Sequence, residues 1–201
     1  MRIGLLGPAD GNAGLLREAS EFLIGDAGVD QAIYLGNDDS IDRMVTSWAR
    51  DIMNGEPTED QFLASAVEAA TDGSAADIER LLVADVAARR LSTIRKLPPP
   101  PARAIEMIDD RIILCVHDKA VLDEEDIANA NVIVYGRSTG PDLKRFGPRY
   151  FFTPGPVTNG KVGVLESEPD GRLVVALYEL TGAPIWREPL DKRVMKLVVT
   201  P

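Results

Sequence analysis

The chain has 201 residues, 45% of them hydrophobic and 27% charged, which is enough apolar material for a buried core and excludes wholesale disorder or a fibrous repeat. The formal net charge of −10 disfavours duplex nucleic acid or an anionic membrane as a partner, because both attract clustered lysine and arginine. With Cys115 and His117 as the single cysteine and the single histidine, neither an intrachain disulfide nor a site with several His or Cys ligands is possible. No stretch approaches the ~20 apolar residues that cross a bilayer, and no signal-peptide cleavage pattern precedes Asp10, so we expect a soluble, cytoplasmic protein.

Strand and helix patterns alternate through the first 52 residues. Apolar runs at 2–6 and 32–35 predict buried strands, each followed by a loop rich in turn residues. After each loop, apolar residues recur at helical spacing, over 15–23 and 41–52. Because buried strands joined by helices favour parallel pairing, we expect a mostly parallel sheet covered on both faces.

Residues 58–93 interrupt this alternation with two helical patterns. Thr58 and Ser74 each stand three residues before a Gln or an Asp, as in a capping box, and predict the two starts of a helical hairpin. Residues 51–90 contain nine acidic side chains and three arginines, so more than half of the net charge lies here. The hairpin is either a solvated surface elaboration or a cap or partner-binding element. One apolar face must be buried on its own domain or on a second subunit: Leu63, Val67, Ile78, Leu81, Leu82 and Val86.

Four prolines at 98–101 separate the hairpin from a second alternating region. They predict stiff polyproline II, acting as a rigid connector or as a ligand for an SH3-type domain. Beyond them, apolar runs predict strands at 111–116 and 132–135 around a short helix at 124–130. From residue 150 onward the pattern is typical of β-hairpins, with strands expected at 150–152, 161–166, 173–180 and 194–200.

Polar loops follow four of the predicted buried strands. In open α/β sheets, ligands bind beyond the carboxyl ends of the strands, where such loops converge. We therefore expect a ligand site among Asp10, Asn12, Asn37, Asp38, Asp39, His117, Asp118, Lys119, Arg137 and Thr139.

Five short motifs lie in and after these loops, in this order along the chain: Pro8-Ala9-Asp10-Gly11-Asn12, Leu35-Gly36-Asn37, Val116-His117-Asp118-Lys119, Tyr135-Gly136-Arg137-Ser138-Thr139 and Thr153-Pro154-Gly155-Pro156. In this order the chain resembles the calcineurin-like metallophosphoesterases, specifically the small bacterial and archaeal phosphodiesterase branch, over about residues 1–50 and 103–180. The resemblance implies a four-layer α/β sandwich. It divides the chain into a phosphoesterase-like domain at 1–182 with a helical insertion at about 51–97, and a C-terminal extension at 183–201.

The departures from that family fall on its metal ligands. The family hydrolyses phosphoesters with two metal ions ~3.5–4 Å apart, which a carboxylate bridges. Here Pro8 stands for an aspartate, Asp10 for a histidine and Asn37 for the bridging aspartate, and three further histidines are replaced by Lys119, Arg137 and Thr139. A neutral amide bridges two dications poorly, and permanent cations repel them. The family's Gly-Asn-His motif is absent from residues 41–104. The resemblance therefore implies a degenerate member in which only His117 remains at the position of a metal ligand.

Three functions follow from this comparison. The first is a non-catalytic pseudoenzyme without a cofactor, which acts as a binding or scaffolding module and meets a protein partner or a second copy through residues 58–93. The second is a phosphodiesterase or phosphatase with an altered one-metal or metal-free site, built from Asp10, Asn37, Asp38, His117 and Arg137. The third is a sensor that holds a phosphorylated small molecule through Arg137 and Lys119.

The candidate side chains also have structural interpretations. His117 is either a remnant metal ligand or general acid, or a strand-end histidine bonded to a neighbouring loop. Arg137 either binds phosphate together with loop amides or forms an ion pair with Asp10, Asp38 or Asp118. Four side chains either supply oxygen ligands to one hard cation or have ordinary turn and cap roles: Asp10, Asn12, Asn37 and Asp38. The weak candidates for metal ligands are Asp10, Asn37 and His117.

Overall fold

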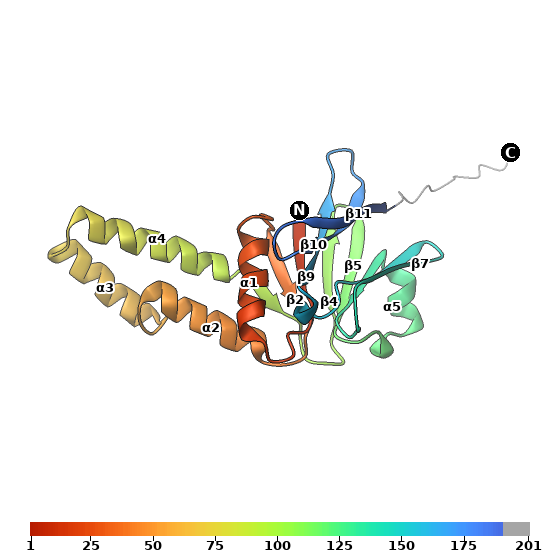
Figure 1. Cartoon of the computed structure of the whole chain (residues 1–201), viewed down its shortest axis with the longest axis horizontal. Helices are drawn as coiled ribbons and strands as arrows, with labels where there is room; N and C mark the ends of the chain where they lie inside the picture. Colours follow the sequence, from red (N-terminus) through yellow and green to blue (C-terminus); the bar gives the residue numbers. More distant parts are fainter. Residues whose placement is uncertain (191–201) are drawn as a thin grey trace.

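Eleven strands form two mixed sheets in the computed structural model, which describes residues 1–190 (Figure 1). The first sheet contains β1 (Arg2–Leu6), β2 (Gln31–Tyr34), β3 (Ile94–Lys96), β9 (Lys161–Ser167), β10 (Leu173–Glu179) and β11 (Pro184–Leu190). Their order across the sheet is β11-β10-β9-β1-β2-β3. The second sheet contains β4 (Ala104–Ile108), β5 (Arg111–Val116), β6 (Val132–Tyr135), β7 (Asp142–Phe146) and β8 (Arg149–Thr153). Their order is β4-β5-β6-β8-β7.

Parallel pairing is limited to β1 with β2, β2 with β3, β5 with β6 and β6 with β8. The other five pairs are antiparallel, so the expectation of a mostly parallel sheet with helices on both faces is wrong. The apolar runs have a different origin. Each sheet carries helices on its outer face and packs against the other sheet on its inner face, so alternate side chains are buried on both sides.

Strand β1 shows this two-sided burial. Ile3 and Leu5 lie in the core between the sheets, with Val134 from β6. Leu6 belongs to the core on the opposite face, where it packs with Leu16 from the first helix. A strand that buries both of its faces carries apolar side chains on both, as residues 3–6 show, while the charged Arg2 at the start of the strand is half-buried.

Helices form the two outer layers. Helices α1 (Ala13–Ile24) and α2 (Ser40–Met53) cover the first sheet. The short helix η1 (Lys119–Val121) and helix α5 (Glu124–Asn129) cover the second sheet, and η2 (Val157–Asn159) follows β8. The four layers confirm the α/β sandwich that the resemblance implied, and the helices expected at 15–23, 41–52 and 124–130 are present.

The predicted hairpin is confirmed as helices α3 (Glu59–Thr71) and α4 (Ala75–Leu91), inserted between β2 and β3. The Thr58 side chain caps α3, and Ser74 forms a capping box with Asp77 at the start of α4. Figure 1 shows the hairpin projecting away from the sandwich. No residue of α3 is buried and only Leu91 of α4 is, so the apolar face expected to be covered stays exposed on this chain.

The four prolines do not form the predicted polyproline II segment. The Pro100–Pro101 peptide bond is cis, and the Ala102 N–H donates to the Pro99 carbonyl oxygen at 3.0 Å. These two features define a tight turn of the kind that places a cis-proline at its third position. The turn follows β3, a strand that the sequence patterns did not indicate.

Strands β4 and β7 were also not predicted, and each lies at an edge of the second sheet. Strand β11, within the predicted C-terminal extension, pairs antiparallel with β10 and joins the first sheet. The strand predicted at 194–200 lies outside the described residues. Between residues 1 and 190, no helix has both the length and the apolar character to cross a membrane.

Candidate functional site

A cavity of about 370 Å³ opens where the strands β1, β2, β5 and β6 end. The parallel pairs β1–β2 and β5–β6 direct their carboxyl ends to the same side of the sandwich, and the loops after them form the wall. The proline turn closes a further side. The lining residues are Pro8, Asp10, Leu35, Asn37, Pro100, Ala102, His117, Asp118, Val121, Arg137, Ser138 and Pro156.

His117 links three segments at the base of this cavity. Its Nδ1 atom lies 3.0 Å from the carbonyl oxygen of Leu35, and its Nε2 atom lies 3.0 Å from that of Pro98. Only 7% of the residue is exposed. A neutral imidazole has one N–H donor and one lone pair, so only the doubly protonated ring donates to both carbonyls. In either form, neither ring nitrogen is directed at the cavity with a free lone pair for a metal.

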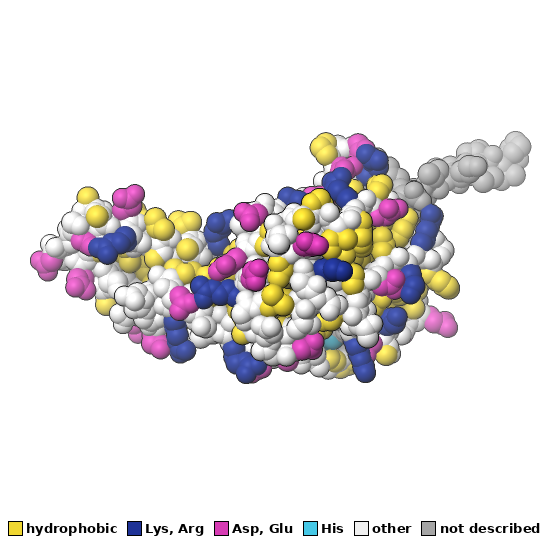
Figure 2. Space-filling model, in the orientation of Figure 1, with side chains coloured by type: hydrophobic (Ala, Val, Ile, Leu, Met, Phe, Trp, Pro, Cys, Tyr) yellow, Lys and Arg dark blue, Asp and Glu magenta, His cyan; other side chains and the backbone are white. Residues whose placement is uncertain are grey.

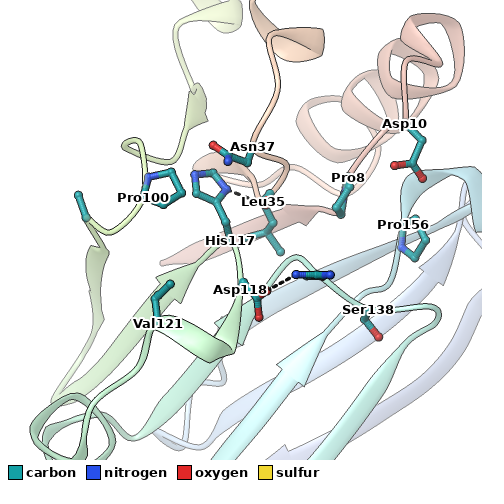
Figure 3. Close-up of a pocket in the computed structure, with 12 residues that line it drawn as sticks. Pro8, Asp10, Leu35, Asn37, Pro100, His117, Asp118, Val121, Ser138 and Pro156 are labelled. Carbon is teal, nitrogen blue, oxygen red and sulfur yellow. Dashed lines mark hydrogen bonds and ion pairs between the residues drawn. The ribbon is translucent and has the colours of Figure 1, made fainter.

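Asp118 and Arg137 form an ion pair on the cavity wall, with 2.9 Å between Oδ2 and Nη1 (dashed in Figure 3). A hydrogen bond from the Ala120 amide, followed by the Arg137 guanidinium, holds the pKa of Asp118 below its ordinary value. Of the three carboxylates predicted as partners for the cations, Asp10, Asp38 and Asp118, it is Asp118 that pairs with Arg137. The reason is local, because β5 and β6 are neighbours and bring the residues just beyond their ends together.

The remaining predicted candidates on the wall do not converge. Figure 3 shows Asn37 beside His117, whereas Asp10 lies toward the opposite end of the cavity, near Pro156. Both Asp10 and Asn37 are exposed. Asp10 has a φ of 50°, a left-handed conformation that aspartate adopts more readily than most residues in tight turns.

Five predicted candidates lie outside the cavity lining. The Asn12 side chain accepts from the Leu15 amide at 3.0 Å and caps α1. The Lys119 ammonium lies 4.9 Å from the centre of the Tyr135 ring, a cation–π contact. The remaining three are Asp38, Thr139 and Asp39, and Asp39 forms an ion pair with Arg43 at 3.0 Å.

Asp38 is held by a buried tyrosine. The Tyr34 hydroxyl donates to Asp38 at 2.8 Å and accepts from the Ala9 amide at 3.1 Å, and the Ser40 amide donates to Asp38 at 3.0 Å. Burial acts to raise the pKa of Asp38, but the hydrogen bonds from Tyr34 and Ser40 outweigh it and hold this pKa below its ordinary value. Asp38 therefore fixes the loop between β2 and α2.

Asp38→Asn is expected to remove a pH-dependent part of the stability. Since the folded-state pKa of Asp38 is lowered, its contribution is present above the ordinary value of 3.8 and is lost as the pH falls through the folded-state value. The difference in free energy of unfolding between wild type and variant should therefore be largest near neutral pH and shrink below about pH 4. Urea denaturation at several pH values measures it, and a difference that grows on acidification would contradict the expectation.

The donor set does not fit a two-metal centre. Such centres need a bridging carboxylate and several further oxygen or nitrogen ligands around one point. Residues 1–190 contain no group of three or more His, Cys, Asp and Glu side chains placed to hold a metal ion. The single imidazole is bonded to backbone carbonyls, and a guanidinium occupies part of the wall.

Sequence reasoning missed the proline turn as part of the site. The Pro98 carbonyl oxygen lies 3.0 Å from Nε2 of His117, and Pro100 and Ala102 line the cavity. Proline carries no ligating side chain, so its residue type gave no signal. Its position directly after a strand of the same sheet could have placed it near the loops, had β3 been recognised.

Comparisons with known proteins identify the fold. No protein-family model matches the chain, and no curated protein matches its sequence. Among solved structures, a predicted phosphoesterase from Streptococcus pneumoniae TIGR4 has 12% sequence identity and a TM-score of 0.55, over 95% of this chain and 97% of its own. Vacuolar protein sorting 29 from Cryptosporidium parvum has 12% identity and a TM-score of 0.50, over 95% and 98%. At these identities the likeness concerns the fold alone.

Proposed function

The chain has the fold of the calcineurin-like metallophosphoesterases, and on that premise we propose that it is a non-catalytic member of this fold, acting as a binding or scaffolding module. The fold by itself does not decide between hydrolysis and binding. One similar structure is described as a phosphoesterase and the other is named for protein sorting. The choice therefore depends on the residues of this chain.

The position of His117 carries the proposal. Two-metal hydrolysis depends on a metal-bound hydroxide, and an imidazole ligand contributes a nitrogen lone pair. Both nitrogens of His117 lie 3.0 Å from backbone carbonyl oxygens, which links the end of β2 to the proline turn. This arrangement supports a structural role for the single histidine of the chain.

The charge on the cavity wall supports the same proposal. Arg137 keeps its positive charge at every physiological pH, and at close range it repels a divalent cation. Its partner Asp118 neutralises it without a metal ion. The cavity thus has an internally balanced ion pair where a hydrolase of this fold needs ligands.

Binding is proposed to involve a protein partner at residues 58–93. The helices α3 and α4 leave six large apolar side chains 42% to 65% exposed, and the described part of this chain does not cover them. Proteins rarely expose so many apolar groups in one place unless they contact another molecule there.

A metal-binding and turnover experiment tests the proposed function. Isothermal titration of the purified chain with Mn²⁺ and Zn²⁺ is expected to show no stoichiometric binding, and bis-p-nitrophenyl phosphate is expected to remain intact in the presence of either metal. Any residual hydrolysis should be the same in wild type and in His117→Ala. Stoichiometric metal binding together with turnover that His117→Ala abolishes would overturn the proposal.

A further inference from the structure

The exposed apolar face of the hairpin consists of two parallel rows of side chains. On α3, Leu63 and Val67 are one helical turn apart, and on α4, Ile78, Leu82 and Val86 follow at successive intervals of four residues. Val83 lies beside the second row. Figure 2 shows hydrophobic side chains over both helices on the face in view. We call these six residues the hairpin stripe.

The hairpin stripe lies away from the sandwich core. Helix α3 contributes no buried residue, and α4 contributes only Leu91 at its end. Helices α3 and α4 contact each other, and Phe62 and Ala69 of α3 are half-buried, whereas Leu63 and Val67 are exposed. The stripe is therefore not the surface that joins the two helices, and it is available to another molecule.

Acidic side chains without a cation partner occur in the same segment as the stripe. The arginines of the hairpin are already engaged: Arg80 pairs with Asp77, Arg89 pairs with Asp85, and Arg90 donates to the Ile24 carbonyl. Within the described residues, five acids of this segment form no ion pair: Glu59, Asp60, Glu68, Asp72 and Glu79. The surface thus combines an apolar stripe with uncompensated negative charge.

We propose that the hairpin stripe binds a basic amphipathic helix of another protein. An apolar row with residues three and four apart would pack on the stripe, and lysine or arginine at its margins would meet the five free acids. A second copy of this chain fits less well. Residues 58–93 carry seven acids and three arginines, so two hairpins would bring like net charges together.

This inference rests on the proposed function as a binding module, and it names the chemistry of the partner. The probe is a fluorescent peptide of ~18 residues, about five helical turns, with leucine at every third or fourth position and lysine elsewhere. Fluorescence anisotropy with the full chain is expected to give a Kd of about 10 µM or tighter at ~50 mM salt. Binding should weaken at least threefold at ~300 mM salt, because salt screens exposed charges. A matched peptide with glutamate in place of lysine should not bind.

Variants locate the binding surface. Val67→Asp and Leu82→Asp are each expected to raise the Kd by about tenfold or more, because each removes apolar contact and places a charge against the leucine row of the peptide. Glu68→Lys and Glu79→Lys should each raise it about threefold and reduce the salt dependence. Phe146→Asp, on β7, is the matched apolar control, and Glu18→Lys, on α1, is the matched charge control. Both controls should leave the Kd unchanged.

Three results would overturn the inference. The first is no binding of the basic peptide, and the second is equal weakening by hairpin and control variants, which would indicate attraction to net charge alone. The third is a dimer in analytical ultracentrifugation that Val67→Asp dissociates, which would identify a second copy as the occupant. Thermal melting of every variant verifies folding, and little change is expected because the substituted side chains are exposed. Failure of the proposed function is detected separately, by metal-dependent turnover, and would leave the peptide result intact.

Discussion

Gly136→Ala is expected to leave most of the chain insoluble or to lower its free energy of unfolding by more than about 3 kcal/mol. A Cβ atom on Gly136 would lie 2.2 Å from the Leu35 carbonyl oxygen and 2.9 Å from its carbon. Gly136 follows β6 in one sheet and Leu35 follows β2 in the other, so the clash separates the two sheets at the cavity. Because the obstacle is backbone, no rotamer change relieves it.

Gly140→Ala is the matched control for this prediction. It lies four residues further along the same loop, and a Cβ atom there meets nothing within 4 Å. Its effect should stay within about 0.5 kcal/mol in either direction. Soluble yield and urea denaturation measure both variants. Equal stability of the Gly136 and Gly140 variants would contradict the close contact between Gly136 and the Leu35 carbonyl group.

His117→Ala is expected to lower the free energy of unfolding by about 3 kcal/mol near neutral pH. The substitution removes the ring that lies 3.0 Å from the carbonyl oxygens of Leu35 and Pro98, and with it the hydrogen bond to at least one of them. A buried acceptor that loses its partner costs about 1–3 kcal/mol. The site around Leu35 is buried, so water replaces the lost donor poorly there. The cost arises without any metal ion.

Lys119→Ala provides the control, because Lys119 is two residues away and exposed, with its ammonium 4.9 Å from the centre of the Tyr135 ring. It should change stability by less than about 1 kcal/mol. Urea denaturation of wild type and both variants in a chelating buffer gives the comparison. If His117→Ala is as stable as wild type under these conditions, then His117 does not link β2 to the proline turn.

The sequence predicted the elements whose signals are local. Capping residues and helical spacing located α1 to α5, and continuous apolar runs located β1, β2, β5 and β6. Strands β3, β4, β7 and β11 were missed because all four lie at sheet edges, where one side of the strand is unpaired and side chains need not be apolar. Strand β3, with Arg95 and Lys96 in three residues, shows this plainly. Parallel pairing was over-predicted because burial between a helix layer and a second sheet produces the same apolar runs.

The sequence predicted the location of the candidate site better than the contacts within it. The rule that loops gather beyond the strand ends located Asp10, Asn37, His117, Asp118 and Arg137 on one cavity. It could not choose the partner of Arg137, because that depends on which strands are neighbours. The contact between His117 and the Pro98 carbonyl oxygen in the proline turn could not be predicted either, because every residue has a backbone carbonyl and side-chain patterns do not identify it.

The hairpin enters and leaves the sandwich between two adjacent strands, β2 and β3, and adds only Leu91 to the core. Core packing therefore places almost no restriction on which amino acids α3 and α4 can carry on their outer surfaces. Mutations that would be purged from β1 or β6 can accumulate on this segment without cost to folding. In evolution, the chain can thus change or lose its partner independently of the sandwich that supports the hairpin.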